Sequence, residues 1–185
     1  QIKINLSRLS ISGTSGTLVP CQSNGVTLGN AIPYNEACTS NSKKLNLIAG
    51  DDTFLNNPYS SLAKAIELIE TFGEDILLRH QSDWLSGWFL NDWSHGEEGN
   101  NVKLGWNIIN KSWPESFEAY SLKKSIPVIK KSGSILGKIN QSIANLLGTS
   151  EHLLIISGTT DSNAAFIAAE VKDNEGLTIL GTTIV

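Results

Sequence analysis

The residues best suited to chemistry lie near the C-terminal end, where an apolar run leads into a turn of small and hydroxyl-bearing side chains. Residues 157–161 read Ser-Gly-Thr-Thr-Asp, and Ala-rich sequence follows. A second apolar run ends at Gly181, Thr182 and Thr183. A positioned carboxylate can accept a proton, and backbone amides with threonine hydroxyls suit phosphate oxygens. The two turns together therefore indicate phosphoryl transfer, with Asp161 as general base.

Asp161 also has a common structural interpretation. A carboxylate directly before a helix is most often an N-cap that satisfies free backbone amides of the first turn. Its neighbours favour the chemical role, because residues 157–160 supply no apolar cover and the alanines after it allow close approach of the helix. A turn at the carboxyl end of a strand is where open α/β sheets bind ligands. An Asp there could serve both roles.

Two further segments could contact a ligand. Residues 12–17 form another Gly/Ser/Thr turn, but they lack the Gly-Lys-Ser/Thr ending of a P-loop, which excludes a Walker loop. A hairpin turn is the ordinary explanation for them. Tyr34 stands beside Asn35 and Glu36, an aromatic next to polar groups, which suits a sugar ring. A tyrosine that packs in a loop is the commoner explanation.

The composition excludes several other classes of function. The 185 residues are 40% hydrophobic and 17% charged with a net charge of -4, as in a soluble globular domain. No basic stripe indicates nucleic acid or a membrane surface as a partner. No apolar run approaches a membrane span of about 18 residues, and no signal peptide begins the sequence. Cytoplasm is the default expectation. The sequence has no Met and ends in an apolar run, which indicates a segment of a longer protein.

Cysteine and histidine spacing gives no sign of a metal site or a disulfide framework. Cys21 and Cys38 have no CxxC spacing, so two reduced thiols are expected. His80, His95 and His152 are scattered along the sequence without metal-ligand spacing.

The pattern of apolar residues predicts the elements that must position these groups. Strands are expected on both sides of the 12–17 turn, and a hairpin is expected with its tip at Asn24 and Gly25. Apolar spacing predicts helices over 59–72 and 79–90 and a third through 135–147 that ends at Gly148. Three tryptophans between 91 and 116 indicate an ordered loop region. A strand over 153–157, a helix over 161–171 and a strand over 177–184 complete an α/β layered fold.

In this order, the motifs resemble the FGGY family of carbohydrate kinases, and most closely its pentulose-kinase branch of D-ribulose/xylulose kinase-like proteins. The matching stretches are residues 11–17 (ISGTSGT), 33–36 (PYNE), 80–85 (HQSDWL), 98–106 (EGNNVKLGW), 132–137 (SGSILG), 158–165 (GTTDSNAA) and 180–183 (LGTT). They span nearly the whole sequence. No single motif is decisive, but the ordered set is specific.

The resemblance implies a ribonuclease-H-like α/β fold of the actin, hexokinase and Hsp70 type, with a sugar in the cleft between two domains. It assigns 1–175 to part of the sugar-binding domain and 176–185 to the start of the ATP-binding domain. Asp161 would take the proton from a pentulose hydroxyl as this attacks the γ-phosphate of ATP. The sugar would meet Thr14, Ser15, Tyr34 and Tyr59. The ATP phosphates would meet Gly181, Thr182 and Thr183, and Mg²⁺ would be bound mostly outside this sequence.

The departures from the family pattern narrow these expectations. Glu36 stands where family members commonly have Asp, which bears on the identity of the sugar. The family's Asp-Phe-Gly-Thr-type phosphate hairpin does not precede Gln1, so the 185 residues alone are expected to be inactive, and an exposed sheet edge makes a homodimer possible. A non-catalytic sugar-binding or regulatory relative is the alternative. An Asp-based phosphatase or ATPase of the same superfold is a third hypothesis.

Overall fold

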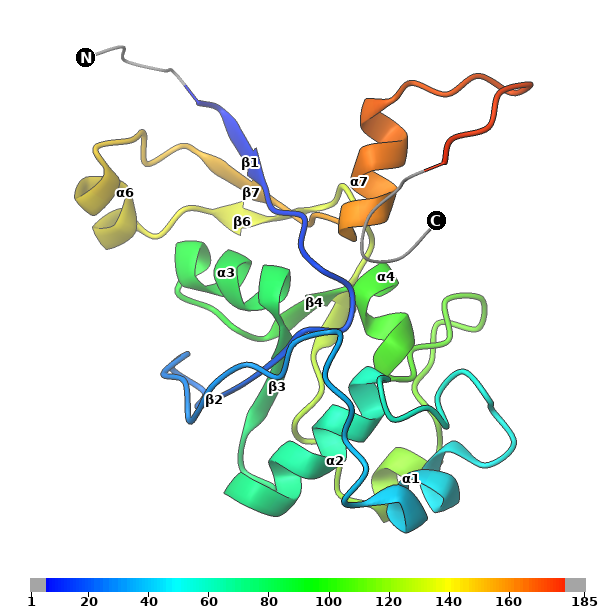
Figure 1. Ribbon diagram of the computed structural model, residues 1–185. Helices are drawn as coiled ribbons and strands as arrows, with labels where there is room; N and C mark the ends of the chain where they lie inside the picture. Colours follow the sequence, from blue (N-terminus) through cyan, green and yellow to red (C-terminus); the bar gives the residue numbers. More distant parts are fainter. Residues whose placement is uncertain (1–5, 179–185) are drawn as a thin grey trace.

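In the computed structural model, which describes residues 6–178, the strand that leads to Asp161 lies at the centre of a three-stranded sheet. This strand, β7 (Leu154–Ile156), pairs in parallel with β1 (Arg8–Ser10) and antiparallel with β6 (Ile135–Lys138). The register aligns Leu9 with Ile155. Figure 1 shows this sheet at the top of the molecule, with α7 (Asp161–Ala168) standing beyond the end of β7.

The elements from residue 18 to residue 130 lie below this sheet in Figure 1. Two short sheets form there: β2 (Leu18–Cys21) is antiparallel to β3 (Leu77–His80), and β4 (His95–Glu97) is parallel to β5 (Val128–Lys130). The other helices are α1 (Ser42–Ala49), α2 (Ser61–Phe72), α3 (Gln81–Leu90), α4 (Glu98–Asn101), the 3-10 helix η1 (Val102–Leu104), α5 (Ser116–Ala119) and α6 (Gln141–Leu147). Helix α3 packs against β2, β3, β4 and β7, and so joins the two parts.

Helix α2 is the centre of the larger hydrophobic core. It begins where Ser60 accepts a hydrogen bond from Ala63 N at 3.1 Å, as expected of an N-cap. Its apolar residues pack with Leu18 and Leu78 of the β2–β3 pair and with Leu104 and Phe117. A smaller core under the three-stranded sheet contains Ile139, Ala144, Leu153 and Ile155.

Several sequence expectations are confirmed and others are wrong. The hairpin turn at Asn24 and Gly25 forms, closed by Gln22 N to Val26 O at 2.8 Å. The strands on either side of the 12–17 turn also form, but they belong to different sheets. The helix expected over 79–90 begins only at Gln81, because residues 77–80 pair with β2 as a strand. The third helix covers only 141–147, since residues 135–138 pair with β7.

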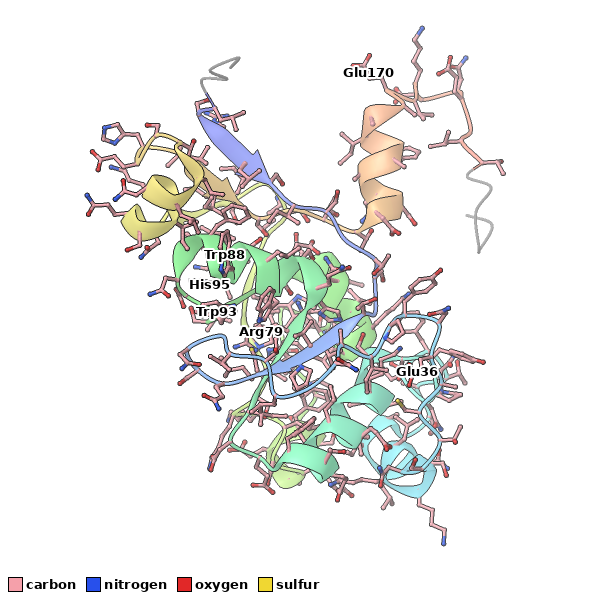
Figure 2. All side chains as sticks on the ribbon, turned by 60° about the vertical axis from the view of Figure 1, so that its left-hand side comes forward. Glu36, Arg79, Trp88, Trp93, His95 and Glu170 are labelled. Atoms are coloured by element: carbon pink, nitrogen blue, oxygen red, sulfur yellow. The ribbon has the colours of Figure 1, made fainter. Side chains whose placement is uncertain are left out.

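The tryptophan-rich region is ordered and contains β4, α4 and η1. The Trp93 ring is buried against Gly25 and Gly87, where an added Cβ would lie within 2.1 Å and 2.5 Å of it. Figure 2 shows Trp93 close to Arg79, whose buried guanidinium donates to Trp93 O and, at 2.8 Å, to Ser125 O. Burial lowers the pKa of Arg79 to about 10. This arginine therefore ties backbone segments together inside the molecule.

Of the two elements expected after residue 160, the structure describes the helix in full but only the first two residues of the strand. Helix α7 ends at Ala168, three residues before the expected end at 171, and Ala169 is its C-cap. The expected strand over 177–184 lies outside the described residues except for 177 and 178, which are not in a strand. No helix within residues 6–178 is long and apolar enough to cross a membrane.

Candidate functional site

Asp161 is the first residue of α7, and Thr160 is its N-cap. Thr160 Oγ1 accepts from Asn163 N at 3.3 Å, so the capping role considered for Asp161 belongs to the threonine before it. The Asp161 side chain is exposed, and its Oδ1 accepts from Ser162 N at 2.8 Å. The carboxylate is therefore available to a ligand.

The turn at Asp161 lies beside the glycine-rich turn that follows β1. Gly13 and Thr160 form a parallel bridge, and Asp161 N donates to Gly13 O at 3.0 Å. Gly158 packs so closely on Ile11 that an added Cβ would lie 1.8 Å from its carbonyl oxygen. Two segments almost 150 residues apart in the sequence are thus held in one place through their backbones.

The expected sugar-contacting tyrosines line one pocket of about 390 Å³. Its lining residues are Tyr34, Asn35, Phe54, Asn57, Tyr59, Ser60 and Lys103. The pocket combines aromatic faces with amide, hydroxyl and ammonium groups. Pockets of this size that carry a few convergent polar groups are typical small-molecule sites.

Lys103 connects this pocket with the glycine-rich turn and Asp161. Its Nζ donates to Ser15 O at 3.2 Å, and its side chain packs beside Gly16. Partial burial lowers the pKa of Lys103, and the negative charge of Asp161 acts in the opposite direction. The Asp161 charge therefore favours the protonated form of Lys103. The two side chains do not form a direct ion pair of 4.0 Å or less.

Thr14 takes part in a hydrogen-bond chain behind the same turn. Its Oγ1 lies 2.7 Å from Thr17 Oγ1 and donates to Gln81 Oε1 at 3.2 Å. Thr17 Oγ1 in turn accepts from the backbone nitrogen of Tyr34 at 3.1 Å. The turn, the pocket loop and the start of α3 are thereby fixed relative to one another.

The structure brings five of the expected site residues into one region: Thr14, Ser15, Tyr34, Tyr59 and Asp161. Gly181, Thr182 and Thr183 lie outside the described residues. Lys103 was missed, because in sequence it stood only as part of the 98–106 stretch. A lysine in a polar, Asn-rich segment carries no signal that distinguishes it from a solvated surface charge.

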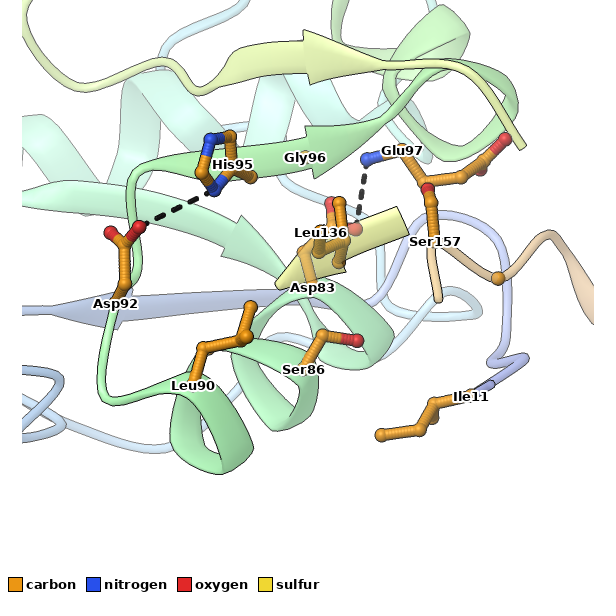
Figure 3. A pocket seen from close by; sticks show the side chains of 12 residues that line it. Ile11, Asp83, Ser86, Leu90, Asp92, His95, Gly96, Glu97, Leu136 and Ser157 are labelled. Carbon is orange, nitrogen blue, oxygen red and sulfur yellow. Dashed lines mark hydrogen bonds and ion pairs between the residues drawn. The ribbon is translucent and has the colours of Figure 1, made fainter. Parts of the chain in front are cut away.

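A buried polar network lies next to this site, around the Asp83 carboxyl group (Figure 3). Asp83 accepts from Glu97 N at 2.9 Å and from Asn101 Nδ2 at 3.2 Å. The Glu97 carboxylate accepts from Asn100 N and from Ser132 Oγ, at 2.7 Å and 2.6 Å. The network thus connects α3, β4 and α4 with the turn that precedes β6, below the three-stranded sheet.

The acid–base states of this network follow from burial. Burial lowers the pKa of His80 to about 3, so the ring is neutral and its 3.8 Å contact with Asp83 is not an ion pair at neutral pH. Burial raises the pKa of Asp83 to about 7, against the hydrogen bonds from Glu97 N and Asn101, which lower it. Asp83 and Glu97 line a cavity of about 10 Å³, the size of one water molecule.

Asp83 should make stability depend on pH. Because its pKa is raised in the folded state, the folded protein binds more protons than the unfolded chain between about pH 4 and 7, and this contribution to the free energy of unfolding is lost as pH rises through that window. In Asp83→Asn this contribution should be absent, so the free energy of unfolding of the wild type minus that of the variant should fall from pH 4.5 to pH 7. Urea unfolding at the two pH values measures it.

The control for this prediction is Asp75→Asn, which changes an exposed carboxylate. It should leave the pH slope of the wild type in place. A slope that Asp83→Asn leaves equally untouched would show that the Asp83 carboxyl group ionises normally in the folded protein.

The described residues do not provide a metal site. Among residues 6–178, no group of three or more His, Cys, Asp or Glu side chains could hold a metal ion. Cys21 is buried and Cys38 half-buried, and both are free thiols. Burial raises the pKa of both, to about 11 for Cys21, so neither is a reactive thiolate.

No protein-family model matches the sequence. Solved structures do resemble its fold. A xylulose kinase from Rhodospirillum rubrum aligns with a TM-score of 0.77 at 15% identity, covering 88% of this chain and 37% of that one. A carbohydrate kinase from Novosphingobium aromaticivorans aligns at 0.73 and 15% identity, covering 92% and 40%.

The likeness extends to a kinase for a different substrate. A glycerol kinase from Plasmodium falciparum aligns at a TM-score of 0.64 and 18% identity, covering 84% of this chain and 34% of that one. The chain thus spans less than half the length of the kinases it matches. At these identities the likeness concerns the fold, and it confirms the expected α/β class: the described residues have the fold of part of these kinase structures.

Proposed function

We propose that the protein that contains this chain transfers the γ-phosphoryl group of ATP to a hydroxyl of a small sugar, with a pentulose such as D-ribulose or D-xylulose as the substrate. The observation that carries the proposal is Lys103, which lines the tyrosine pocket and donates to Ser15 O in the glycine-rich turn. Gly13 of the same turn bonds to Asp161 N, so one short segment connects the pocket with the carboxylate residue. The sugar-kinase fold of the described residues supports the same conclusion.

In this proposal, Asp161 acts as general base. Its carboxylate takes the proton of the sugar hydroxyl while the hydroxyl oxygen forms a bond to the γ-phosphorus, and the bond between that phosphorus and the bridging oxygen of ADP breaks. Tyr34 and Tyr59 offer aromatic faces to the sugar, and Lys103 donates a hydrogen bond to one of its oxygens. These groups orient the substrate, and positioning is one of the two main contributions to phosphoryl-transfer catalysis, beside electrostatic stabilisation.

The nucleotide side of the reaction rests on other residues. Gly181, Thr182 and Thr183 are proposed to bind ATP phosphates at the start of a second domain, over 176–185, while 1–175 belongs to the sugar domain. No group of three or more His, Cys, Asp or Glu side chains among residues 6–178 could hold a metal, and Mg²⁺ is proposed to bind mostly to residues outside this sequence.

The proposal is tested by a sugar panel with the complete gene product. ADP release is followed with D-ribulose, D-xylulose, D-gluconate and glycerol as acceptors, and with no acceptor as the control. ADP release that depends on a pentulose supports the proposal. Sugar binding without ADP release indicates a non-catalytic sugar-binding or regulatory protein, and ADP release that no sugar stimulates indicates a phosphatase or ATPase.

Replacing Lys103 tests the central observation. In Lys103→Met we expect the KM for the sugar to rise tenfold or more, because a hydrogen bond from a charged donor contributes about 1.5–3 kcal/mol. Steady-state rates at saturating ATP, with the sugar varied, measure this. Lys123→Met removes only an exposed ion pair with Glu118 and should leave KM unchanged. An unchanged KM in Lys103→Met would remove Lys103 from the site.

A further inference from the structure

Lys64 is a buried charge that the proposed chemistry does not use. It lies in the first turn of α2, and its residue is 0% exposed. Lysine is almost never fully buried unless it is paired, since removing an ammonium from water is costly. Within residues 6–178, Lys64 belongs to none of the ion pairs. The cost of burying it therefore needs an explanation other than a salt bridge.

The partners of the ammonium are two backbone carbonyls behind the pocket. Lys64 Nζ donates to Tyr59 O at 2.7 Å and to Tyr34 O at 3.4 Å. Tyr34 and Tyr59 come from different loops, one before α1 and one before α2, and the side chains of both line the 390 Å³ pocket. One ammonium thus holds both aromatic walls of the pocket from behind, without lining the pocket itself.

One other hydrogen bond joins the two loops: Cys38 N donates to Pro58 O, on the residue before Tyr59, at 2.9 Å. Tyr59 is 52% exposed, so its ring is not held by burial. The Lys64 ammonium is the group that bonds directly to the backbones of both tyrosines.

We propose that Lys64 is a positioning residue that holds Tyr34 and Tyr59 at the spacing that binds the substrate. The identity of that substrate as a sugar rests on the proposed function. We call the two hydrogen bonds from Lys64 Nζ to Tyr34 O and Tyr59 O the clamp. The clamp depends only on these two hydrogen bonds and on the pocket that both tyrosines line.

The clamp should have its own dependence on pH. Burial lowers the pKa of Lys64 to about 8; Lys103 acts in the same direction, while Cys38 and Glu36 oppose it. Above that pH the neutral amine is a weaker donor, so the tyrosines should be held less firmly. The free energy of unfolding should instead rise with pH. The pKa of Lys64 in the folded protein lies below its ordinary value of 10.5, so the penalty for burying the charge is relieved as pH rises from about 8 to 10.5.

The test compares wild type with Lys64→Met and Lys64→Arg in the complete gene product. Lys64→Met should weaken the binding of D-ribulose or D-xylulose by roughly tenfold or more in calorimetry, with the KM for ATP nearly unchanged. Wild-type affinity should fall between pH 7 and 9.5, and this fall should be smaller in Lys64→Met and in Lys64→Arg, whose charge does not titrate there. The remaining fall comes from Lys103, which lines the pocket and whose pKa is also lowered. Lys44→Met, which removes only a surface ion pair with Glu70, is the matched control.

Amide hydrogen exchange tests the clamp without a sugar. At one pH, Lys64→Met should exchange faster than wild type at residues 34–36, 57, 59 and 60, and equally at the core of α2. Equal exchange in both loops would overturn the clamp, whatever the sugar results. If Lys64→Met does not fold, the wild-type pH profile decides: affinity that stays constant from pH 7 to 9.5 would overturn the proposal. If the wild type binds no sugar at all, the proposed function is wrong. Hydrogen exchange in the two loops then still tests the clamp, because that measurement needs no sugar.

Discussion

Asp161→Asn in the complete gene product is expected to lower kcat for sugar phosphorylation at least about a hundredfold, the lower range for a positioned general base. The amide keeps the size of the side chain and can still accept from Ser162 N, which now bonds to Asp161 Oδ1 at 2.8 Å. It cannot take up the proton of the sugar hydroxyl. The KM for the sugar should change by less than about threefold, because the interaction that is lost develops in the transition state.

The exposure of Asp161 makes this result easy to interpret. Thr160 and not Asp161 caps α7, so the substitution should leave the free energy of unfolding within about 0.5 kcal/mol of wild type. Asp51→Asn, which changes another exposed carboxylate, is the control and should leave kcat unchanged. Turnover close to that of wild type in Asp161→Asn would remove the general base from the proposed mechanism.

The parts of the fold that the sequence predicted well are those decided by neighbouring residues. Helix α2 follows from its apolar spacing and from the cap at Ser60, and the turn at Gly25 follows from Asn-Gly. The strand–turn–helix that carries Asp161 was predicted for the same reason, since its apolar run, small turn and alanines lie within fifteen residues. In each case the local preferences and the tertiary contacts agree.

The errors came where a distant partner decided the structure. Residues 79 and 80 were expected to begin the helix that covers 81–90, but β2 is available to pair with 77–80, so these residues form a strand. Ile135, Ile139 and Ile143 have helix-like spacing, yet residues 135–138 form the edge strand β6 beside β7. A single sequence does not show which segment pairs with which, because the hydrogen-bonding partner lies about 20 to 60 residues away.

The site was predictable in its acids and aromatics but not in its lysines. Asp161, Tyr34 and Tyr59 carry recognisable chemistry, and the structure places them close to one glycine-rich turn. Lys64 and Lys103 look like ordinary surface charges in sequence, because only the folded chain shows one buried behind the pocket and the other lining it. Burial of a charge is a tertiary property, and no spacing rule for helices indicates it.

Gly158→Ala is expected to damage both the fold and the site. The new Cβ would lie 1.8 Å from Ile11 O and 2.6 Å from Ile11 C, which are backbone atoms that cannot rotate away. The turn after β7 must therefore move off the segment after β1. Overpacking of this kind costs about 1–3 kcal/mol and occasionally more, and a backbone clash belongs at the upper end of that range. Urea unfolding of wild type and variant measures the loss.

The same displacement should reach Asp161, because its backbone nitrogen bonds to Gly13 O and Thr160 bridges Gly13. A shift of about 1 Å in a reacting group can cost a hundredfold in rate, so kcat should fall even in the folded fraction. Gly176→Ala, where the new Cβ meets nothing within 4 Å, is the control for both measurements. If Gly158→Ala keeps wild-type stability and turnover, the close contact with Ile11 does not hold the turn, and the position of Asp161 must be fixed by α7 alone.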